Sequence, residues 1–291
     1  MIGWEHLFAR IHAGLLVPYL GPGMTAMALD LQKQSAQRTG QNTAHDSILP
    51  SSTQELAEFF GRHVALPKRA RGNPWASAQY IESKRHRQTL DALMDRAFAM
   101  PVAPSPLHFS LAASAPVMIV DTWYDGIMRV ALDCVAGAHW GEVQGTPRTG
   151  VRDFTWYRAY DAKGEAVPMP NAAEWKTLLY KPHGSVAPAH NYLVADSDYV
   201  EVLTELDIQT PIPDIVQQRR AQVGFLFLGC RFDDQMLRAY ARQIMKRSAG
   251  PHYAIMPNME LTRNELRFLE EMQIIRLDLP LVGTDYVCDP A

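Results

Sequence analysis

Four short segments of the sequence place glycine or a titratable residue directly after an apolar run, where a parallel sheet presents its ligand-binding edge. The first is residues 21–25, Gly-Pro-Gly-Met-Thr, which follow the run Leu15–Leu20. Glycines at such a turn let backbone N–H groups approach a phosphate, and the N-terminus of the following helix favours its negative charge. A tight turn without a ligand explains the same residues equally well, so both interpretations of Gly21 and Gly23 stay open.

The second and third segments contain the acid–base groups. Residues 121–125, Asp-Thr-Trp-Tyr-Asp, end one apolar run, and residues 181–185, Lys-Pro-His-Gly-Ser, follow another. His183 stands between proline and glycine, so rigid backbone positions it, and the usual histidine pKa suits proton transfer near neutral pH. In the alternative interpretation Asp125 caps a helix, Trp123 packs in the core and His183 is a hydrogen-bonded loop residue.

The fourth segment, residues 229–238, repeats the pattern of strand, glycine turn and helix start after the run Phe225–Leu228. Gly229 would form the turn, and Asp233 and Asp234 would stand at the N-terminus of the helix. Either a ligand-binding turn or a plain turn followed by a helix cap would have this sequence.

The elements that must position these residues are strands and helices in alternation. Six apolar runs have the continuity of buried parallel strands, and segments of helical period lie between them. The runs are Leu15–Leu20, Val117–Val120, Thr177–Tyr180, Phe225–Leu228, Tyr253–Met256 and Ile274–Leu277. The pattern predicts an α/β fold with a mostly parallel six-stranded sheet and helices on both faces.

Two segments interrupt the alternation within what we expect to be one domain over residues 1–291. Residues 35–100 predict a small helical cap, in which Ser52 and Glu55 have the spacing of a capping box. The polar stretch Gln32–Ser51 predicts a long loop. Residues 140–173 predict a small insert with a hairpin, formed by 154–161 and a turn at 162–164.

Taken together, the four segments resemble the sirtuin-like superfamily, in particular its zinc-free bacterial branch of NAD-hydrolysing domains used in phage defence. That family has a Gly-Ala-Gly-x-Ser loop, then Thr-Thr-Asn-Tyr-Asp, then Lys-x-His-Gly-Ser, then Gly-Tyr-Ser with a later Asp and Leu-Arg. The resemblance covers about residues 10–250 and is most specific at 183–185 and 229–238. Residues 106–108, Pro-Leu-His, are similar to a further family motif.

The resemblance implies a Rossmann-like domain that binds NAD as substrate or ligand. It implies that the glycine loop holds the pyrophosphate, that His183 deprotonates a ribose hydroxyl and that Asp125 lies near the nicotinamide amide. The cofactor-binding positions carried over from the family are Gly21, Gly23, Thr25, Thr122, Asp125, Gly184, Ser185, Gly229, Arg231 and Asp234. No metal site is implied.

Two positions depart from the family pattern. Trp123 stands where the family has an asparagine, and an indole donates a hydrogen bond but accepts none. Arg231 stands where the family has a serine, and Asp121 is the first candidate to replace the asparagine. Two functions therefore stay open: an NAD glycohydrolase-type effector that releases nicotinamide from a degenerate active site, and a catalytically inactive NAD or ADP-ribose binder that acts as a sensor or partner subunit.

Composition narrows the class of protein further. The chain of 291 residues is 47% hydrophobic and 20% charged, which excludes a disordered or fibrous protein. Three scattered cysteines supply neither a four-thiolate zinc site nor a disulfide framework, which favours the reduced cytoplasm. No apolar run is long enough to span a bilayer, so we expect no membrane partner.

The net charge of −3 gives no general attraction to nucleic acid. The basic segment Lys68–Arg87, with Trp75 and Tyr80, would suit nucleic acid or an acidic partner, but a solvated face is the favoured interpretation. Because the family's effectors are gated by a partner and this chain is nearly all sirtuin-like domain, we expect a separate sensor protein or a homo-oligomer.

Overall fold

The computed structural model describes residues 2–39, 49–135, 139–147, 156–205, 212–257 and 259–281. Its strands are β1 (Leu16–Leu20), β2 (Met118–Asp121), β3 (Trp140–Gly145), β4 (Tyr157–Asp161), β5 (Ala166–Val167), β6 (Thr177–Lys181), β7 (Gly184–Ser185), β8 (Asn191–Tyr192), β9 (Gly224–Leu228), β10 (His252–Ile255) and β11 (Ile274–Leu277). Its helices are α1 (Trp4–His12), α2 (Gly23–Arg38), α3 (Thr53–His63), α4 (Pro74–Arg85), α5 (Arg87–Phe98), α6 (Pro106–Ala113), α7 (Ile127–Cys134), η1 (Met169–Ala173), α8 (Asp196–Glu205), α9 (Asp214–Arg220), α10 (Gln235–Met245) and α11 (Arg263–Glu271).

The central sheet has the strand order β11-β10-β9-β1-β2-β6-β3-β4-β5. It is parallel from β11 to β3, and only the pairs β3–β4 and β4–β5 are antiparallel. All six expected runs form strands of this sheet. The fold class is therefore confirmed, but the expected number of six strands is wrong, because the sheet has nine.

The three additional strands belong to the expected insert. Strand β3 reads Trp-Gly-Glu-Val-Gln-Gly, so it lacks the apolar run by which a buried parallel strand is recognised. Its buried Glu142 is neutralised by Arg129 at 2.7 Å and accepts a hydrogen bond from Gln144 at 2.6 Å. Strands β4 and β5 form a hairpin, closed by the N–H of Gly164 on the Asp161 carbonyl at 2.9 Å, and residues 154 and 155 of the expected hairpin lie outside the described residues. The insert therefore extends the sheet.

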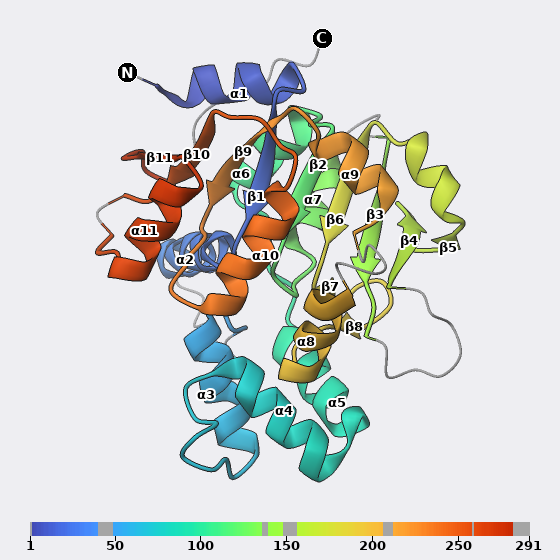
Figure 1. Ribbon diagram of the computed structural model, residues 1–291, viewed down its shortest axis with the longest axis vertical. Coiled ribbons are helices and arrows are strands. Elements are labelled where there is room, and N and C mark those ends of the chain that lie inside the picture. The colour runs from blue at the N-terminus through green and yellow to red at the C-terminus, as the bar shows by residue number, and fades with distance from the viewer. Residues whose placement is uncertain are drawn as a thin grey trace.

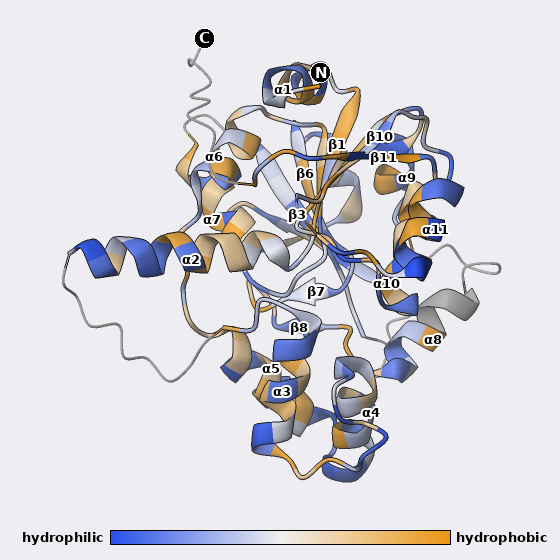
Figure 2. Ribbon diagram, turned by 90° about the vertical axis from the view of Figure 1, so that its left-hand side faces the viewer, coloured by the Kyte–Doolittle hydropathy of each residue, from blue (hydrophilic) through white to orange (hydrophobic). Residues whose placement is uncertain are grey.

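Helices cover both faces of the sheet, as expected. Figures 1 and 2 show α2, α6 and α7 on one face and α9, α10 and α11 on the other. Figure 2 also shows that the strands between these layers are largely hydrophobic. Two apolar clusters of buried residues correspond to the two sides, one containing Leu20, Leu111 and Leu132 and the other containing Phe227 and Ile244.

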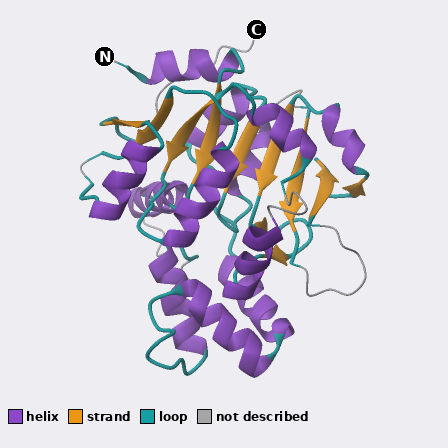
Figure 3. Ribbon diagram, in the orientation of Figure 1, coloured by secondary structure: helices purple, strands orange, loops and turns teal. Residues whose placement is uncertain are grey.

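The helical cap consists of α3, α4 and α5, which lie beyond the carboxyl ends of the strands (Figures 1 and 3). Ser52 caps α3 by accepting the N–H of Glu55 at 3.1 Å, and the Glu55 carboxylate accepts the N–H of Ser51 at 2.7 Å. The expected loop over Gln32–Ser51 is wrong at its start, since α2 continues to Arg38. Residues 40–48 of that stretch lie outside the described residues.

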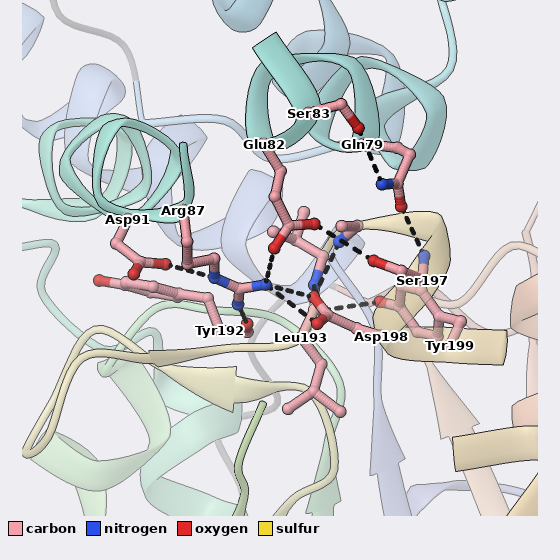
Figure 4. Close-up of polar contacts among 12 residues, drawn as sticks. Gln79, Glu82, Ser83, Arg87, Asp91, Tyr192, Leu193, Ser197, Asp198 and Tyr199 are labelled. Carbon is pink, nitrogen blue, oxygen red and sulfur yellow. Dashed lines mark hydrogen bonds and ion pairs between the residues drawn. The ribbon is translucent and has the colours of Figure 1, made fainter. Parts of the chain in front are cut away.

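A buried ion-pair network attaches the cap to the chain that follows His183 (Figure 4). Arg87 of α5 donates to both carboxylate oxygens of Asp198 in α8, at 2.9 and 3.0 Å, and to the carbonyl of Tyr192 in β8. Asp198 also accepts the N–H groups of Val194 and Ala195 at 2.9 and 3.0 Å. The orientation of α8 therefore depends on the position of α5.

Candidate active site

The glycine turns after β1 and β9 pack directly against each other. The N–H groups of Gly21 and Gly23 donate to the carbonyls of Leu228 and Gly229, both at 2.9 Å. A Cβ atom on Gly21 would lie 2.6 Å from the Gly229 carbonyl oxygen, and one on Gly23 would lie 2.8 Å from the Gly229 Cα. Gly229 itself has a φ of +63°, which favours glycine. Close contact between the two turns therefore explains by itself why these three positions are glycine.

A buried lysine organises the loop that follows β2. The Lys181 ammonium donates to the Asp121 carboxylate at 2.8 Å and to the carbonyls of Trp123 and Asp125 at 2.5 and 2.8 Å. Its side chain is 2% exposed. Burial raises the pKa of Asp121 to about 6, although the adjacent Lys181 acts in the opposite direction. Lys181 fixes the backbone of residues 121–125 and satisfies all three of its donor positions.

Asp125 joins the first, second and third segments. Its carboxylate accepts the Thr25 hydroxyl at 2.5 Å and the N–H of Ile127, the first residue of α7, at 2.9 Å, although the N-cap residue of that helix is Gly126 and not Asp125. The Ser185 hydroxyl donates to the Asp125 carbonyl at 3.1 Å. Thr122 donates its hydroxyl to the Leu20 carbonyl at 2.8 Å, which ties the same loop to β1. These contacts bring the predicted residues together at the carboxyl ends of β1, β2 and β6.

His183 is enclosed by tyrosine rings. Its ring centroid lies 4.4 Å from that of Tyr240, 5.4 Å from Tyr199 and 6.5 Å from Tyr124. The His183 side chain is buried, and neither ring nitrogen has a hydrogen-bond partner within the part of the chain that the structure describes. Burial, together with the charge of Lys181, lowers the pKa of His183 to about 3. The imidazole is therefore neutral at physiological pH.

Gly184 holds the turn that presents His183. Its φ is +75°, and a Cβ atom there would lie 2.2 Å from the Asn191 carbonyl oxygen. Strand β7, which it begins, pairs antiparallel with β8, and the His183 carbonyl accepts the N–H of Leu193 at 2.9 Å. The position of His183 is thus set by backbone pairing.

Trp123 packs in the core between the sheet and the cap. Its indole N–H donates to the Pro50 carbonyl at 2.8 Å, and its ring lies 5.8 Å from Phe98 and 5.4 Å from Tyr124. The indole is 2% exposed. Core packing therefore accounts for Trp123, and its only hydrogen-bonding group is already in use.

The fourth segment contributes an ion pair and a helix cap. Arg231 forms a two-point contact with Glu265 of α11, at 2.8 and 2.9 Å, and Glu265 also accepts the N–H of Phe232 at 3.1 Å. Burial acts to raise the pKa of Glu265, but these hydrogen bonds outweigh it and hold the pKa at about 2. Asp234 caps α10 by accepting the N–H of Met236 at 2.7 Å. In the described conformation, Arg231 is thus directed to α11.

A cavity of about 470 Å³ borders the Asp125 side of this arrangement. It lies between the end of α5, the start of α7 and the loop after β7, and its walls include Phe98, Ile127 and Val186. Asp125 is 5% exposed and keeps two of roughly four carboxylate lone-pair positions after its two hydrogen bonds. The cavity therefore has largely apolar walls, to which Asp95, Arg129 and His190 add charged or titratable groups, and the Asp125 carboxylate can still accept hydrogen bonds.

The sequence did not predict that Lys181 organises the loop after β2. It also did not predict that Tyr199 and Tyr240 contact His183. Lys181 is the last residue of the buried strand β6, and its place at the end of an apolar run was the one signal in the sequence that its charge is buried. Tyr199 and Tyr240 lie on α8 and α10, remote in sequence from His183, and carry no local signal. His108 was noted only as part of a motif. Burial lowers its pKa to about 4, against the opposite effect of Asp125.

The basic segment has the features of a solvated face. Trp75 is buried and its ring lies 5.0 Å from Tyr199, so it is not available for stacking with bases. Arg87 is held by carboxylates, whereas Lys68, Arg69, Lys84 and Arg85 are exposed.

The described residues contain no cluster of three or more His, Cys, Asp or Glu side chains that could hold a metal ion. None of their helices combines the length and apolar character that crossing a membrane requires.

Comparison with known families is consistent with this arrangement. No curated protein matches the sequence. Residues 117–276 match the profile of the SIR2-like domain, and this range contains the loop at 121–125, His183 and the turn at Gly229. The match covers more than half of the chain. The chain belongs to the SIR2-like domain family, whose members have NAD-related functions.

Proposed function

We propose that this protein binds NAD at the carboxyl ends of β1, β2, β6 and β9 and hydrolyses its bond to nicotinamide. The observation that carries the proposal is His183, whose two ring nitrogens are buried without a partner among the described residues. An unpaired buried polar group costs about 1–3 kcal/mol, so its retention at the ligand-binding edge of the sheet favours a ligand that completes it.

Asp125 is the residue best placed to recognise the nicotinamide amide. Its carboxylate is fixed by Thr25 and Ile127 and borders the cavity of about 470 Å³. The NH₂ group of a carboxamide is a donor, and the remaining lone pairs of Asp125 are acceptors. Apolar walls with a few oriented polar groups, here Asp125 beside Asp95, Arg129 and His190, are typical of small-molecule sites. Nicotinamide would therefore be held with its amide on Asp125 and its ring against the apolar wall.

His183 would act on the ribose. A neutral imidazole can accept a proton from a ribose hydroxyl, and the oxocarbenium-like transition state would be stabilised by fixed dipoles around it. A histidine whose pKa is about 3 is a weak base, because efficient proton transfer needs a pKa near the working pH. The described conformation thus corresponds to low hydrolytic activity, and we propose that a partner protein or a second copy of the chain opens the site.

A catalytically inactive NAD or ADP-ribose binder is the second candidate. The observation that favours it is Trp123, which occupies the family's asparagine position and spends its only donor on Pro50. Asp121 is paired with Lys181 and cannot readily replace that asparagine. Such a binder would act as a sensor or partner subunit.

The wider setting follows from the resemblance and stays part of the proposal. We propose a cytoplasmic effector in phage defence, gated by a separate sensor protein or by self-association. We expect no nucleic-acid or membrane partner. Arg231 and Asp234, which are engaged by Glu265 and by α10, would have to be released before they could contact the ligand.

The test is to incubate the purified chain with NAD and follow both binding and nicotinamide release. His183→Asn is the test variant, and His12→Asn is the matched control because His12 is exposed on α1, at the far end of the strands (Figure 1). Release by wild type and by the control, but not by His183→Asn, supports the hydrolase. Because we propose slow release from the closed site, binding with no release at all, even in long incubations at high protein concentration, supports the inactive binder. Absence of NAD binding by wild type overturns both candidates.

A further inference from the structure

Three buried polar atoms without a hydrogen-bond partner among the described residues belong to two side chains whose rings are in contact. The two ring nitrogens of His183 and the hydroxyl of Tyr240 are buried, and none has a hydrogen-bond partner among the described residues. The two rings are in contact, with centroids 4.4 Å apart. Arg10, Trp75 and Arg220 contribute one orphaned nitrogen each, so the His183–Tyr240 pair is the place where such atoms gather.

Tyr199, whose ring also packs against His183, differs from Tyr240 because its hydroxyl has hydrogen-bond partners. Tyr199 donates its hydroxyl to the Leu193 carbonyl at 2.9 Å and lies 3.2 Å from the hydroxyl of Tyr124. Tyr124 donates to the same carbonyl at 2.7 Å. The hydroxyls of Tyr199 and Tyr124 are therefore structural, whereas the Tyr240 hydroxyl has no structural use in the described conformation.

We propose that Tyr240 is a ligand-binding residue that, together with His183, holds the vicinal diol of a ribose. This inference rests on the proposed function and names a residue that neither the sequence pattern nor the family match singles out.

The donor and acceptor pattern supports a diol. A neutral imidazole offers one donor and one acceptor, and a phenol offers one donor and an acceptor oxygen. Two adjacent hydroxyls have the complementary set, since each donates once and accepts. A phosphate or carboxylate would instead need charged donors to offset its burial, and the imidazole is uncharged.

Ligand binding at this pair requires the packing to open. His183 and Tyr240 are 2% and 6% exposed, and Tyr199 of α8 packs against both rings, at 5.4 and 5.3 Å. Tyr240 is carried by α10, which starts at the turn after β9. A small movement of α8 or α10 would separate the rings. The diol could then reach the ring nitrogens of His183 and the hydroxyl of Tyr240.

The experiment compares Tyr240→Phe with Tyr199→Phe, each of which removes one hydroxyl and keeps the ring. Affinity is measured by calorimetry with carba-NAD, in which a carbon replaces the ring oxygen of the nicotinamide ribose, so that the diol is kept and the bond to nicotinamide is not hydrolysed. We expect Tyr240→Phe to weaken binding roughly three- to tenfold, the range for one neutral hydrogen bond. We expect its urea midpoint to stay equal to that of wild type or to rise, because an orphaned polar group is lost.

Tyr199→Phe is the control for stability, and its urea midpoint should fall because a satisfied buried hydroxyl is removed. A Tyr240→Phe protein that binds carba-NAD as tightly as wild type overturns the assignment of Tyr240, while wild-type and His183→Asn binding still test the proposed function. A urea midpoint of Tyr240→Phe that falls as far as that of Tyr199→Phe also overturns it, since the hydroxyl would then be structural. Wild type that binds no carba-NAD overturns the proposed function, and with it the role of Tyr240.

Discussion

Acidification should lower the free energy of unfolding, because His183 is buried in its neutral form. The folded pKa is about 3, below the value of about 6.5 for histidine in an unfolded chain. In acid the unfolded chain therefore binds a proton at this position that the folded chain does not. The stabilisation is fully present above pH 6.5 and is lost as the pH falls toward 3. At pH 5.0, which is about 1.5 units below the unfolded pKa, the free energy of unfolding is therefore lower by about 2 kcal/mol, because each pH unit corresponds to about 1.4 kcal/mol.

The assay is urea unfolding of wild type and His183→Leu at pH 7.5 and pH 5.0, followed by tryptophan fluorescence. The free energy of unfolding of the variant, relative to wild type, should rise by about 2 kcal/mol between the two pH values. His108, with a folded pKa of about 4, loses stability over the same range, and Asp121, with a folded pKa of about 6, gains it. Both are present in the two proteins, so their contributions cancel in the difference.

His12→Leu is the control, because it removes an exposed histidine of α1 and leaves the buried site unchanged. The reasoning would be refuted if the free-energy difference between wild type and His183→Leu were the same at both pH values. That result would mean that His183 takes up a proton in the folded chain, which requires an open site in solution.

Three further outcomes follow from the contacts around this site. Lys181→Met should lower the free energy of unfolding by about 3–5 kcal/mol in urea unfolding at pH 7.5, because it leaves the Asp121 carboxylate buried and unpaired. Arg87→Met should accelerate amide hydrogen exchange in α4, α5 and α8, because Asp198 loses the cation that joins them, and unchanged exchange would contradict the role of that network. Gly23→Ala should lower the urea midpoint by an amount equivalent to roughly 1–3 kcal/mol, since its Cβ would lie 2.8 Å from the Gly229 Cα. An unchanged midpoint would mean that the two glycine turns can separate at little cost.

The sequence predicted the parallel part of the sheet because burial on both faces leaves a continuous apolar run. That signal is present in β1, β2, β6, β9 and β10 and absent in β3, whereas the edge strand β11 was predicted from its Ile and Leu residues although Ile275 and Arg276 are exposed. Strand β3 is buried through paired polar groups, Glu142 with Arg129 and Gln144, and pairing across the fold is invisible in a local pattern. The extension of α2 to Arg38 was missed for a related reason, because a polar helix exposed to solvent has the composition of a loop.

The sequence predicted which residues lie in the candidate site, but it predicted few of the contacts that they make. Motif order was sufficient to bring Thr25, Asp125 and Ser185 together, because parallel strands end at the same edge of the sheet. The Tyr240 contact to His183 depends on how α10 packs, and no spacing in the sequence encodes it. The same holds for Arg231, whose two-point contact with Glu265 joins residues 34 positions apart.

Trp123 stands where the family has an asparagine, and this difference affects the packing of the protein as well as its chemistry. Its indole bridges the sheet to the cap, with the ring against Phe98 of α5 and the N–H on the Pro50 carbonyl. An asparagine in its place would leave a cavity, and truncation of a buried tryptophan typically costs about 3–5 kcal/mol. Activity measured on Trp123→Asn would therefore combine a chemical gain with a structural loss. His183, whose side chain has no hydrogen bond to lose among the described residues, is the position at which chemistry and stability can be separated.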